Sequence, residues 1–181
     1  MKEQLIQTAI DLWQKHGYHN VSVNEICASC GVTKGSFYYH FVNKESVILA
    51  YYSSCLDTAG KSEESGSSYL ERIFALIRQS TDPLVVLNRD ILLVFLTSDG
   101  IREASNYLLS SFESTQVYQR MVEYCRKAQE CGEIRDTIDA QQLIDTALIN
   151  MTGNMYRWVI DDKNFDLYER DRQQLEIILK K

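Results

Sequence analysis

Apolar residues recur at every third or fourth position over most of the chain, a spacing that places them on one face of an α-helix. The first such segment covers residues 2–16, and Gly17 follows it where a helix would end. The same spacing predicts helices over residues 44–60, 69–79, 113–131, 140–160 and 166–180. One proline and eight glycines leave room for long helices, so the pattern predicts an all-α protein.

The middle of the chain is more apolar than the rest. Residues 84–96 are apolar on most sides, which is typical of a buried helix, and we expect Asp82 and Pro83 to begin it. The segments 101–112 and 113–131 form either two helices or one bent helix, and the pattern alone leaves both open.

A polar segment over residues 61–68 separates the two groups of predicted helices. It contains serine, glutamate and glycine but no large apolar residue, which indicates a loop. We therefore predict a small domain of residues 1–60 and a larger helical domain of residues 61–181.

Residues 22–44 predict two short helices joined by a tight turn. Ser22 can cap the first helix, and Glu25, three residues later, completes a capping box. Gly31 is expected to end that helix in the left-handed conformation, and Thr33 to cap the next. Two helices joined by a four-residue turn with glycine form the DNA-binding helix-turn-helix. A small helical hairpin with solvated polar residues is the alternative.

The second of these helices, residues 34–41, has two distinct faces. Phe37 and Phe41 are four positions apart and share the face expected to be buried. Gly35 has no side chain, which would let the backbone approach DNA closely. The outward positions can offer hydrogen-bond donors to the major groove, and they are Lys34, Ser36, Tyr38 and His40. Asn43 is expected to cap a further helix that begins at Lys44.

Beyond the bare pattern, residues 5–56 resemble the N-terminal domain of the TetR (tetracycline repressor) family of transcriptional regulators. The matching features are Ala9, Leu12-Trp13, Gly17-Tyr18, Ser22-Val23, Ile26-Cys27, Gly31-Val32, Gly35-Ser36-Phe37-Tyr38, His40-Phe41 and Asn43-Lys44-Glu45. The rest of the chain matches the family only in its helical layout. The resemblance implies an all-helical homodimer whose N-terminal helix-turn-helix binds operator DNA and whose C-terminal domain binds a small ligand that releases the DNA.

The resemblance also implies roles for individual residues. Ser22, Thr33 and Lys44 would hold DNA phosphates. The complete predicted DNA-binding set is Ser22, Thr33, Lys34, Gly35, Ser36, Tyr38, Tyr39, His40 and Lys44. By the same resemblance, the helices over 113–131 and 140–160 would build the dimer interface.

The charge of the chain changes this picture only a little. The net charge is −6, and residues 1–60 carry four lysines against five acids, a net of −1. The bulk basic patch of many nucleic-acid binders is therefore absent. However, residues 31–44 contain two lysines and a histidine and no acid, and charge acts on phosphates only within a Debye length of about 10 Å. We expect weak non-specific DNA binding rather than none.

Other chemistry finds little support in the sequence. Cys27 and Cys30 form a C-x-x-C, but both lie on one predicted helix without a second pair, so ordinary thiols are favoured over a zinc or redox site. No phosphate-binding glycine loop, G-x-S-x-G or H-E-x-x-H motif occurs, which argues against an enzyme, and no cofactor is expected. No apolar run of about 18 residues occurs, so we expect no membrane segment. The five cysteines, an odd number without a disulfide-framework spacing, fit a reducing cytoplasm, so we expect a cytoplasmic protein.

The sequence thus predicts a cytoplasmic, homodimeric transcriptional regulator, most simply a repressor that a small molecule releases from a palindromic operator. A ligand-independent regulator or an activator of the same fold is the alternative. The aromatic residues of the C-terminal half are ordinary core by default, but some can line a ligand cavity. The candidates are Phe74, Phe95, Tyr107, Phe112 and Trp158.

Overall fold

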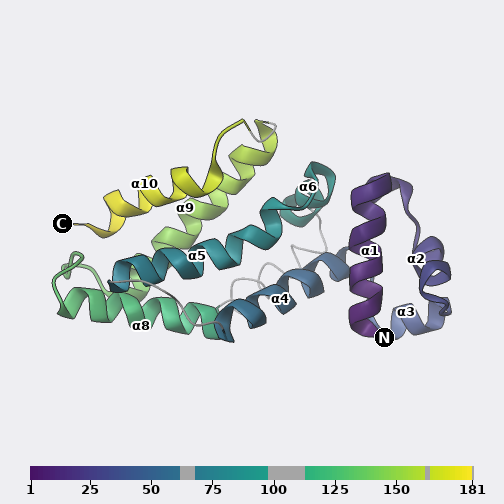
Figure 1. Ribbon diagram of the computed structural model, residues 1–181, viewed down its shortest axis with the longest axis horizontal. Coiled ribbons are helices and arrows are strands. Elements are labelled where there is room, and N and C mark those ends of the chain that lie inside the picture. The colour runs from purple at the N-terminus through teal and green to yellow at the C-terminus, as the bar shows by residue number, and fades with distance from the viewer. Residues whose placement is uncertain (62–67, 98–112, 162–163, 181) are drawn as a thin grey trace. The chain divides into compact units, whose positions relative to one another are not determined.

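The computed structural model describes residues 1–61, 68–97, 113–161 and 164–180, and every regular element in these ranges is a helix (Figure 1). This agrees with the all-α prediction. None of the helices in the described ranges is both long and apolar enough to cross a membrane. Two of the predicted ligand residues, Tyr107 and Phe112, lie outside the described residues, as do most of the 61–68 segment and the choice between one and two helices over 101–131.

The chain divides into two compact units, which are described separately. Unit 1 comprises Met1–Cys55 and Pro83–Ser110, and unit 2 comprises Leu56–Asp82 and Ser111–Lys181. Helix α4 (Glu45–Lys61) passes from unit 1 into unit 2, and helix α5 (Tyr69–Val85) passes back. The division into domains of residues 1–60 and 61–181 stays a prediction.

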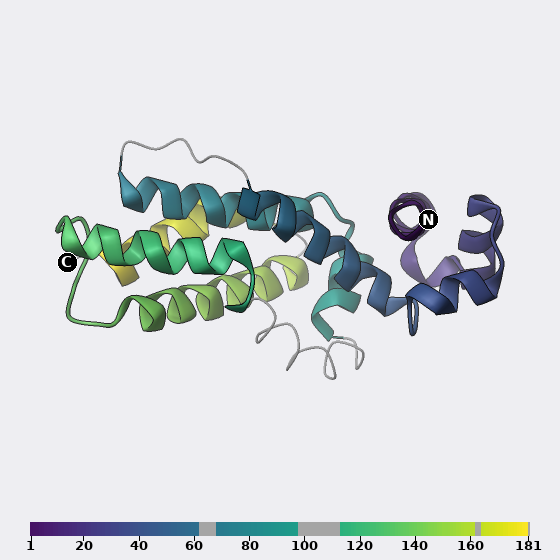
Figure 2. The ribbon, with the colours of Figure 1, turned by 90° about the horizontal axis from the view of Figure 1, so that it is seen from below.

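Unit 1 contains the predicted helix-turn-helix. Its elements are α1 (Lys2–His16), the 3-10 turn η1 (Tyr18–Asn20), α2 (Val23–Cys30), α3 (Lys34–His40), the first part of α4, and α6 (Arg89–Thr97). Figure 2 shows α1 end-on, with α2 and α3 beside it. Leu5, Trp13, Ile26 and Phe37 are fully buried, so the apolar faces of α1, α2 and α3 meet in one small core.

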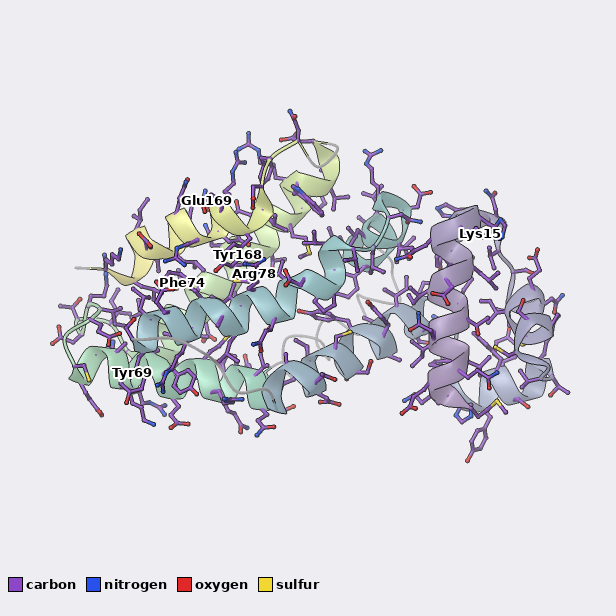
Figure 3. The ribbon with its side chains drawn as sticks, viewed as in Figure 1. Lys15, Tyr69, Phe74, Arg78, Tyr168 and Glu169 are labelled. Atoms are coloured by element: carbon purple, nitrogen blue, oxygen red, sulfur yellow. The ribbon has the colours of Figure 1, made fainter. Side chains whose placement is uncertain are left out.

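Unit 2 is built from α8 (Gln116–Glu130), α9 (Ala140–Ile160) and α10 (Leu167–Leu179), together with most of α5 and the end of α4. Helix α9 packs against both α8 and α10. Between α5 and α10, the Arg78 guanidinium lies 5.0 Å from the centre of the Tyr168 ring, and the two side chains face each other in Figure 3. Arg172 of α10 pairs with Glu71 of α5 at 2.6 Å, which joins the same two helices.

The C-terminal end of α10 is held by a loop residue. Arg135, between α8 and α9, donates from its guanidinium to the carbonyl oxygens of Ile177 and Lys180 at 3.0 and 2.6 Å. A cation is favourable here because the last carbonyls of a helix have no partner within the helix.

The structure corrects the boundary predicted at Pro83. Instead of beginning a helix, Pro83 lies in the last turn of α5, and α6 begins six residues later. Asn88 caps α6 by accepting from the Ile91 amide at 3.0 Å. Proline destabilises a helix because it removes one backbone N–H donor. In the last turn of a helix, only the hydrogen bond to the preceding turn is lost, so the rest of the helix can form. The continuous helix predicted over 84–96 is therefore broken between α5 and α6.

Most other helix ends lie where the sequence placed them. Asp139 accepts from the amides of Gln141 and Gln142 at the start of α9, and Asp166 accepts from the Glu169 amide at the start of α10. Helix α1 ends at Gly17, whose φ of 85° favours glycine. These ends were predictable because each cap is formed by residues within a few positions of the helix terminus.

Candidate DNA-binding surface

The first helix of the motif, α2, is fixed by a capping box at its start. Ser22 accepts from the Glu25 amide through its hydroxyl at 3.3 Å, while the Glu25 carboxylate accepts from the Ser22 amide at 2.8 Å. The Ser22 amide and the Ser22 hydroxyl both donate to this carboxylate, which lowers the pKa of the Glu25 carboxyl. The helix ends at Gly31 with a φ of 67°, the left-handed conformation predicted from the sequence.

The second helix, α3, is anchored by its buried face. Thr33 caps it by accepting from the Ser36 amide at 3.2 Å. Phe37 and Phe41 are buried, and their ring centres are 5.4 Å apart. A helix of only seven residues is not stable by itself, so this cap and these two rings hold it in place.

The opposite face of α3 is open to solvent. Tyr39 is 84% exposed and Tyr38 is 55% exposed, and Lys34 and Gly35 are exposed beside them. A Cβ added to Gly35 would contact only the Thr33 hydroxyl, at an ordinary 3.6 Å. The protein itself therefore does not require glycine at this position, which leaves a close approach to DNA as its predicted purpose.

Two members of the predicted set are less accessible. Ser36 and His40 are partly buried, and the Ser36 hydroxyl lies 3.2 Å from that of Thr33. The His40 ring packs edge-on against Tyr39 with ring centres 4.9 Å apart. Both residues thus border the exposed face rather than forming its centre.

Lys44 has a different environment from the one that its predicted role suggests. Its ammonium donates to the backbone carbonyls of Tyr18 and Val21 at 2.7 and 3.0 Å. It also lies 3.8 Å from the centre of the Tyr18 ring, within cation–π distance. Burial lowers the pKa of this ammonium. Helix α4 begins at Glu45, one residue after the predicted start, and Asn43 caps it by accepting from the Ser46 amide at 2.8 Å.

The C-x-x-C cysteines lie on α2, as predicted. Cys27 is buried, and burial raises the pKa of its thiol, which disfavours the reactive thiolate. The Cys30 sulfur lies 3.9 Å from the Gln4 carbonyl oxygen of α1. Among the described residues no cluster of three or more histidine, cysteine or acidic side chains could hold a metal ion.

The described ligand candidates are buried in different units. In unit 2, Phe74 lies 4.7 Å from the Arg172 guanidinium, and the Trp158 indole donates to the Phe165 carbonyl at 2.8 Å. In unit 1, Phe95 packs against Tyr52 with ring centres 5.4 Å apart. Their role in ligand binding stays a prediction.

Comparison with known proteins identifies the motif. The model of the family "Bacterial regulatory proteins, tetR family" matches residues 5–51, from α1 into α4. Residues 5–51 therefore form a TetR-family domain. Within this stretch it is 43% identical over 49 residues to the uncharacterized HTH-type transcriptional regulator YerO of Bacillus subtilis, an alignment that spans 27% of this chain and 17% of YerO.

Similarity over the whole length of the chain is lower. The fatty acid metabolism regulator protein of Bacillus subtilis is 22% identical, with 97% of this chain and 92% of that protein aligned. The crystal structure of FadR from the same organism, in complex with stearoyl-CoA, superposes with a TM-score of 0.69 at 18% identity and covers 99% of this chain and 98% of FadR. A TetR/AcrR-family regulator from Thermobifida fusca superposes with a TM-score of 0.61 at 25% identity, covering 98% and 95% of the two chains. These superpositions cover nearly the whole chain, so the similarity of fold includes the C-terminal unit.

Sequence reasoning missed two contacts that shape the TetR-family domain. Asn88 donates to the Trp13 carbonyl at 2.9 Å, and the Tyr18 hydroxyl donates to the Glu45 carboxylate at 2.7 Å. Asn88 lies three residues before Ile91, which begins an apolar run. An asparagine at this distance is typical of a helix N-cap, so this part of its role could have been predicted. Nothing local in the sequence indicates that it also reaches α1.

Proposed function

We propose that this protein is a cytoplasmic, homodimeric repressor that binds a palindromic operator through α2 and α3 and leaves it when a small molecule binds its C-terminal unit. One observation carries the proposal: α3 is held from behind by buried Phe37 and Phe41 while its opposite face, around Tyr39, is open to solvent. A recognition helix needs this combination, because base edges are read only by side chains that reach the groove from a fixed support.

Within this proposal the DNA-contacting residues fall into two groups. Ser22 and Thr33 cap adjacent helix starts, where backbone N–H groups attract phosphate. The exposed face of α3 reads bases or lines the groove; it consists of Lys34, Gly35, Tyr38 and Tyr39, with Ser36 and His40 at its border. Phosphate contacts would set the position of the domain, and base contacts would set its sequence preference.

The dimer is supported by an uncovered apolar stripe on α9. Ile149 is 71% exposed, Tyr156 and Ile160 are each about half exposed, and all three lie at helical spacing around Gly153. A Cβ added to Gly153 meets no atom within 4 Å, so a second helix could approach closely there. Ile177 of the neighbouring α10 is 75% exposed. A second copy of the chain would cover this surface.

The same observations favour α9 and α10 as the seam over the predicted pair of 113–131 and 140–160. The exposed positions of α8 are polar or charged, and they include Gln119, Glu123, Arg126 and Glu130. Stable homodimer interfaces are more apolar than that. Helix α9 belongs to the dimer interface in both the predicted pair of helices and the pair proposed here.

For the effector, we propose a fatty acyl-CoA thioester as the first class to test. The support is that a relative aligned over nearly the whole chain is a fatty acid metabolism regulator, and that the structures of two similar regulators were solved in complex with stearoyl-CoA and lauroyl-CoA. A ligand releases DNA only if it binds one arrangement of the helices more tightly than the other. A coupling of about 1–3 kcal/mol would change operator affinity roughly 5–150-fold.

The experiment has two stages. Selection of binding sites from a pool of random duplex DNA should enrich one inverted repeat. Acyl-CoAs of several chain lengths are then added to the complex, with free CoA and free fatty acid as controls. Release by acyl-CoA but not by either control supports the effector class. Enrichment without release by any acyl-CoA rejects that class while leaving DNA recognition in place, and no enrichment rejects the repressor itself.

A further inference from the structure

A buried side-chain amide on α9 has more acceptors around it than it has hydrogens. The Asn154 side-chain nitrogen lies 2.7 Å from Asp171 Oδ1 and 2.7 Å from Gln174 Oε1, both on α10. It also lies 3.2 Å from Asn150 Oδ1, one turn earlier on α9. An amide nitrogen carries only two hydrogens, so at least one of these oxygens receives none from it. The buried Asp171 carboxylate is the costliest to leave without a donor, so the shortage falls on the oxygens of Asn150 and Gln174.

Both of these amide side chains border the exposed apolar positions of α9 and α10. Asn150 follows Ile149, and Gln174 is three positions before Ile177, on the same side of α10. Both are only partly buried. Apart from Asn154, no group of the described residues donates to either oxygen. A donor that covered the apolar surface from outside could therefore reach them.

The Tyr156 hydroxyl is a suitable donor, but only for another copy of the chain. The Tyr156 side chain is 48% exposed, and its hydroxyl has no hydrogen-bond partner among the described residues. Within one helix, side chains that face each other are three or four positions apart, whereas Tyr156 and Asn150 are six apart. A tyrosine hydroxyl that becomes buried at an interface usually finds a polar partner.

A two-fold axis at Gly153 would bring the two groups together. Asn150 and Tyr156 lie three positions before and after Gly153, where an added Cβ would meet no atom within 4 Å. In an antiparallel crossing at that point, each residue before Gly153 faces the residue equally far after it in the other copy. Asn150 and Tyr156 of the partner subunit then both lie about 4.5 Å along the helix from the crossing. A parallel crossing would instead face Tyr156 with Tyr156 of the partner subunit, away from the amide oxygens.

We propose that two copies of the chain pack α9 on α9 in antiparallel directions across Gly153, and that Tyr156 of the partner subunit donates its hydroxyl hydrogen to Asn150 Oδ1. The contact occurs twice, once on each side of the two-fold axis. It supplies the hydrogen that the cluster around Asn154 lacks. This inference rests on the proposed homodimer, and it adds the direction of the two helices and the pair of residues that fixes their register.

The first test measures the dimer dissociation constant of the full-length chain by sedimentation equilibrium for Tyr156→Phe, Asn150→Ala and the double variant. Tyr156→Phe removes one hydroxyl from a half-exposed side chain, so each chain should still fold. It should raise the dissociation constant roughly 5-fold or more, because two hydrogen bonds are lost. The double variant should be no weaker than the weaker single variant, since both changes remove the same bond. Gln119→Ala, on the exposed face of α8, is the control and should combine with Tyr156→Phe independently.

The second test cross-links Asn150→Cys and Tyr156→Cys chains with a short bis-maleimide, with the wild type as background. A mixture of the two variants, allowed to exchange subunits, should give covalent dimers above that background, while neither variant should do so alone. The inference is overturned if the two losses of affinity multiply in the double variant, or if Tyr156→Cys cross-links by itself, and in both cases the homodimer remains. A wild-type chain that stays monomeric at every concentration overturns the inference and the proposed homodimer together.

Discussion

Asn88 donates its side-chain amide to the backbone carbonyl of Trp13 at 2.9 Å, across 75 positions of the sequence. Trp13 lies in the last turn of α1, and Asn88 is the residue that caps α6. One side chain thus both caps α6 and attaches it to α1, the helix against which α2 packs. A second bond, from Gln14 to the Val86 carbonyl at 3.3 Å, supports the same attachment. Within unit 1, these two hydrogen bonds fix α1 to the start of α6 and to the segment before it.

The first prediction concerns this residue. Asn88→Ala removes both the cap and the bond to α1 and should destabilise unit 1 by about 1–2 kcal/mol. Asn88→Asp keeps the oxygen that accepts from Ile91 but has no donor for the Trp13 carbonyl. We expect both variants to lower the urea midpoint of unfolding. If Asn88→Asp is as stable as the wild type, the hydrogen bond to the Trp13 carbonyl contributes nothing to the stability of unit 1.

The second prediction concerns the dimer seam. Gly153→Leu should weaken dimerisation, because the side chain would fill the space that a facing helix needs. It should not destabilise the monomer, since leucine is more favourable than glycine inside a helix by roughly 0.5–0.8 kcal/mol. The matched control is Gln119→Leu, on the exposed face of α8. Sedimentation velocity at several concentrations measures the equilibrium. A stronger effect from Gln119→Leu than from Gly153→Leu would place the seam on α8.

The third prediction concerns pH. Asp171 of α10 is 1% exposed, and burial raises the pKa of its carboxyl to about 6, although a hydrogen bond from the Asn154 amide at 2.7 Å favours the charged form. The folded state therefore binds this proton more tightly than the unfolded state, whose carboxyl has a pKa near 3.8. The contribution of this group to stability should fall as pH rises from about 4 through about 6, by roughly 3 kcal/mol at most.

Asp171→Asn tests that sign. The variant cannot ionise at this position, so it should be more stable than the wild type at pH 7 and should approach it near pH 4. Asp136→Asn is the control, because Asp136 is exposed in the loop before α9. Urea unfolding at intervals between pH 4 and 8 gives both curves. A wild-type stability that rises through this window relative to Asp171→Asn would contradict the direction of the shift.

The fourth prediction separates base reading from phosphate contact on α3. Lys34→Ala and Tyr39→Ala remove side chains from the exposed face and should weaken binding to the operator more than binding to random DNA. Thr33→Ala should weaken both alike, and it should also cost about 1 kcal/mol of stability because Thr33 caps α3. Fluorescence anisotropy with both duplexes checks this. Equal losses for all three variants would reject the division of roles.

The local parts of the structure could be predicted from the sequence. The capping box at Ser22, the left-handed Gly31, the caps at Thr33, Asp139 and Asp166, and the buried pair Phe37 and Phe41 each depend on residues within four or five positions of one another. Helix boundaries follow from such short-range signals. The main error, at Pro83, came from treating proline as the start of a helix when it occupies the last turn of one.

The parts that could not be predicted depend on distant residues. The Lys44 ammonium is directed inward by carbonyls 26 and 23 positions earlier, although the sequence around it only indicates a lysine at a helix start. The bond from Asn88 to Trp13 has no local signal either. In both cases, packing of helices that are remote in sequence decides where a polar side chain finds its partner.

We propose that the exposed face of α3 reads a specific DNA sequence for a two-fold dimer. It is tested most directly by the dissociation constants of the full-length chain for the selected inverted repeat and for a scrambled duplex of equal length and composition, at one salt concentration near 150 mM. We expect binding to the repeat that is tighter by a factor of about 10³ or more. Dissociation constants that agree within a few-fold would contradict it.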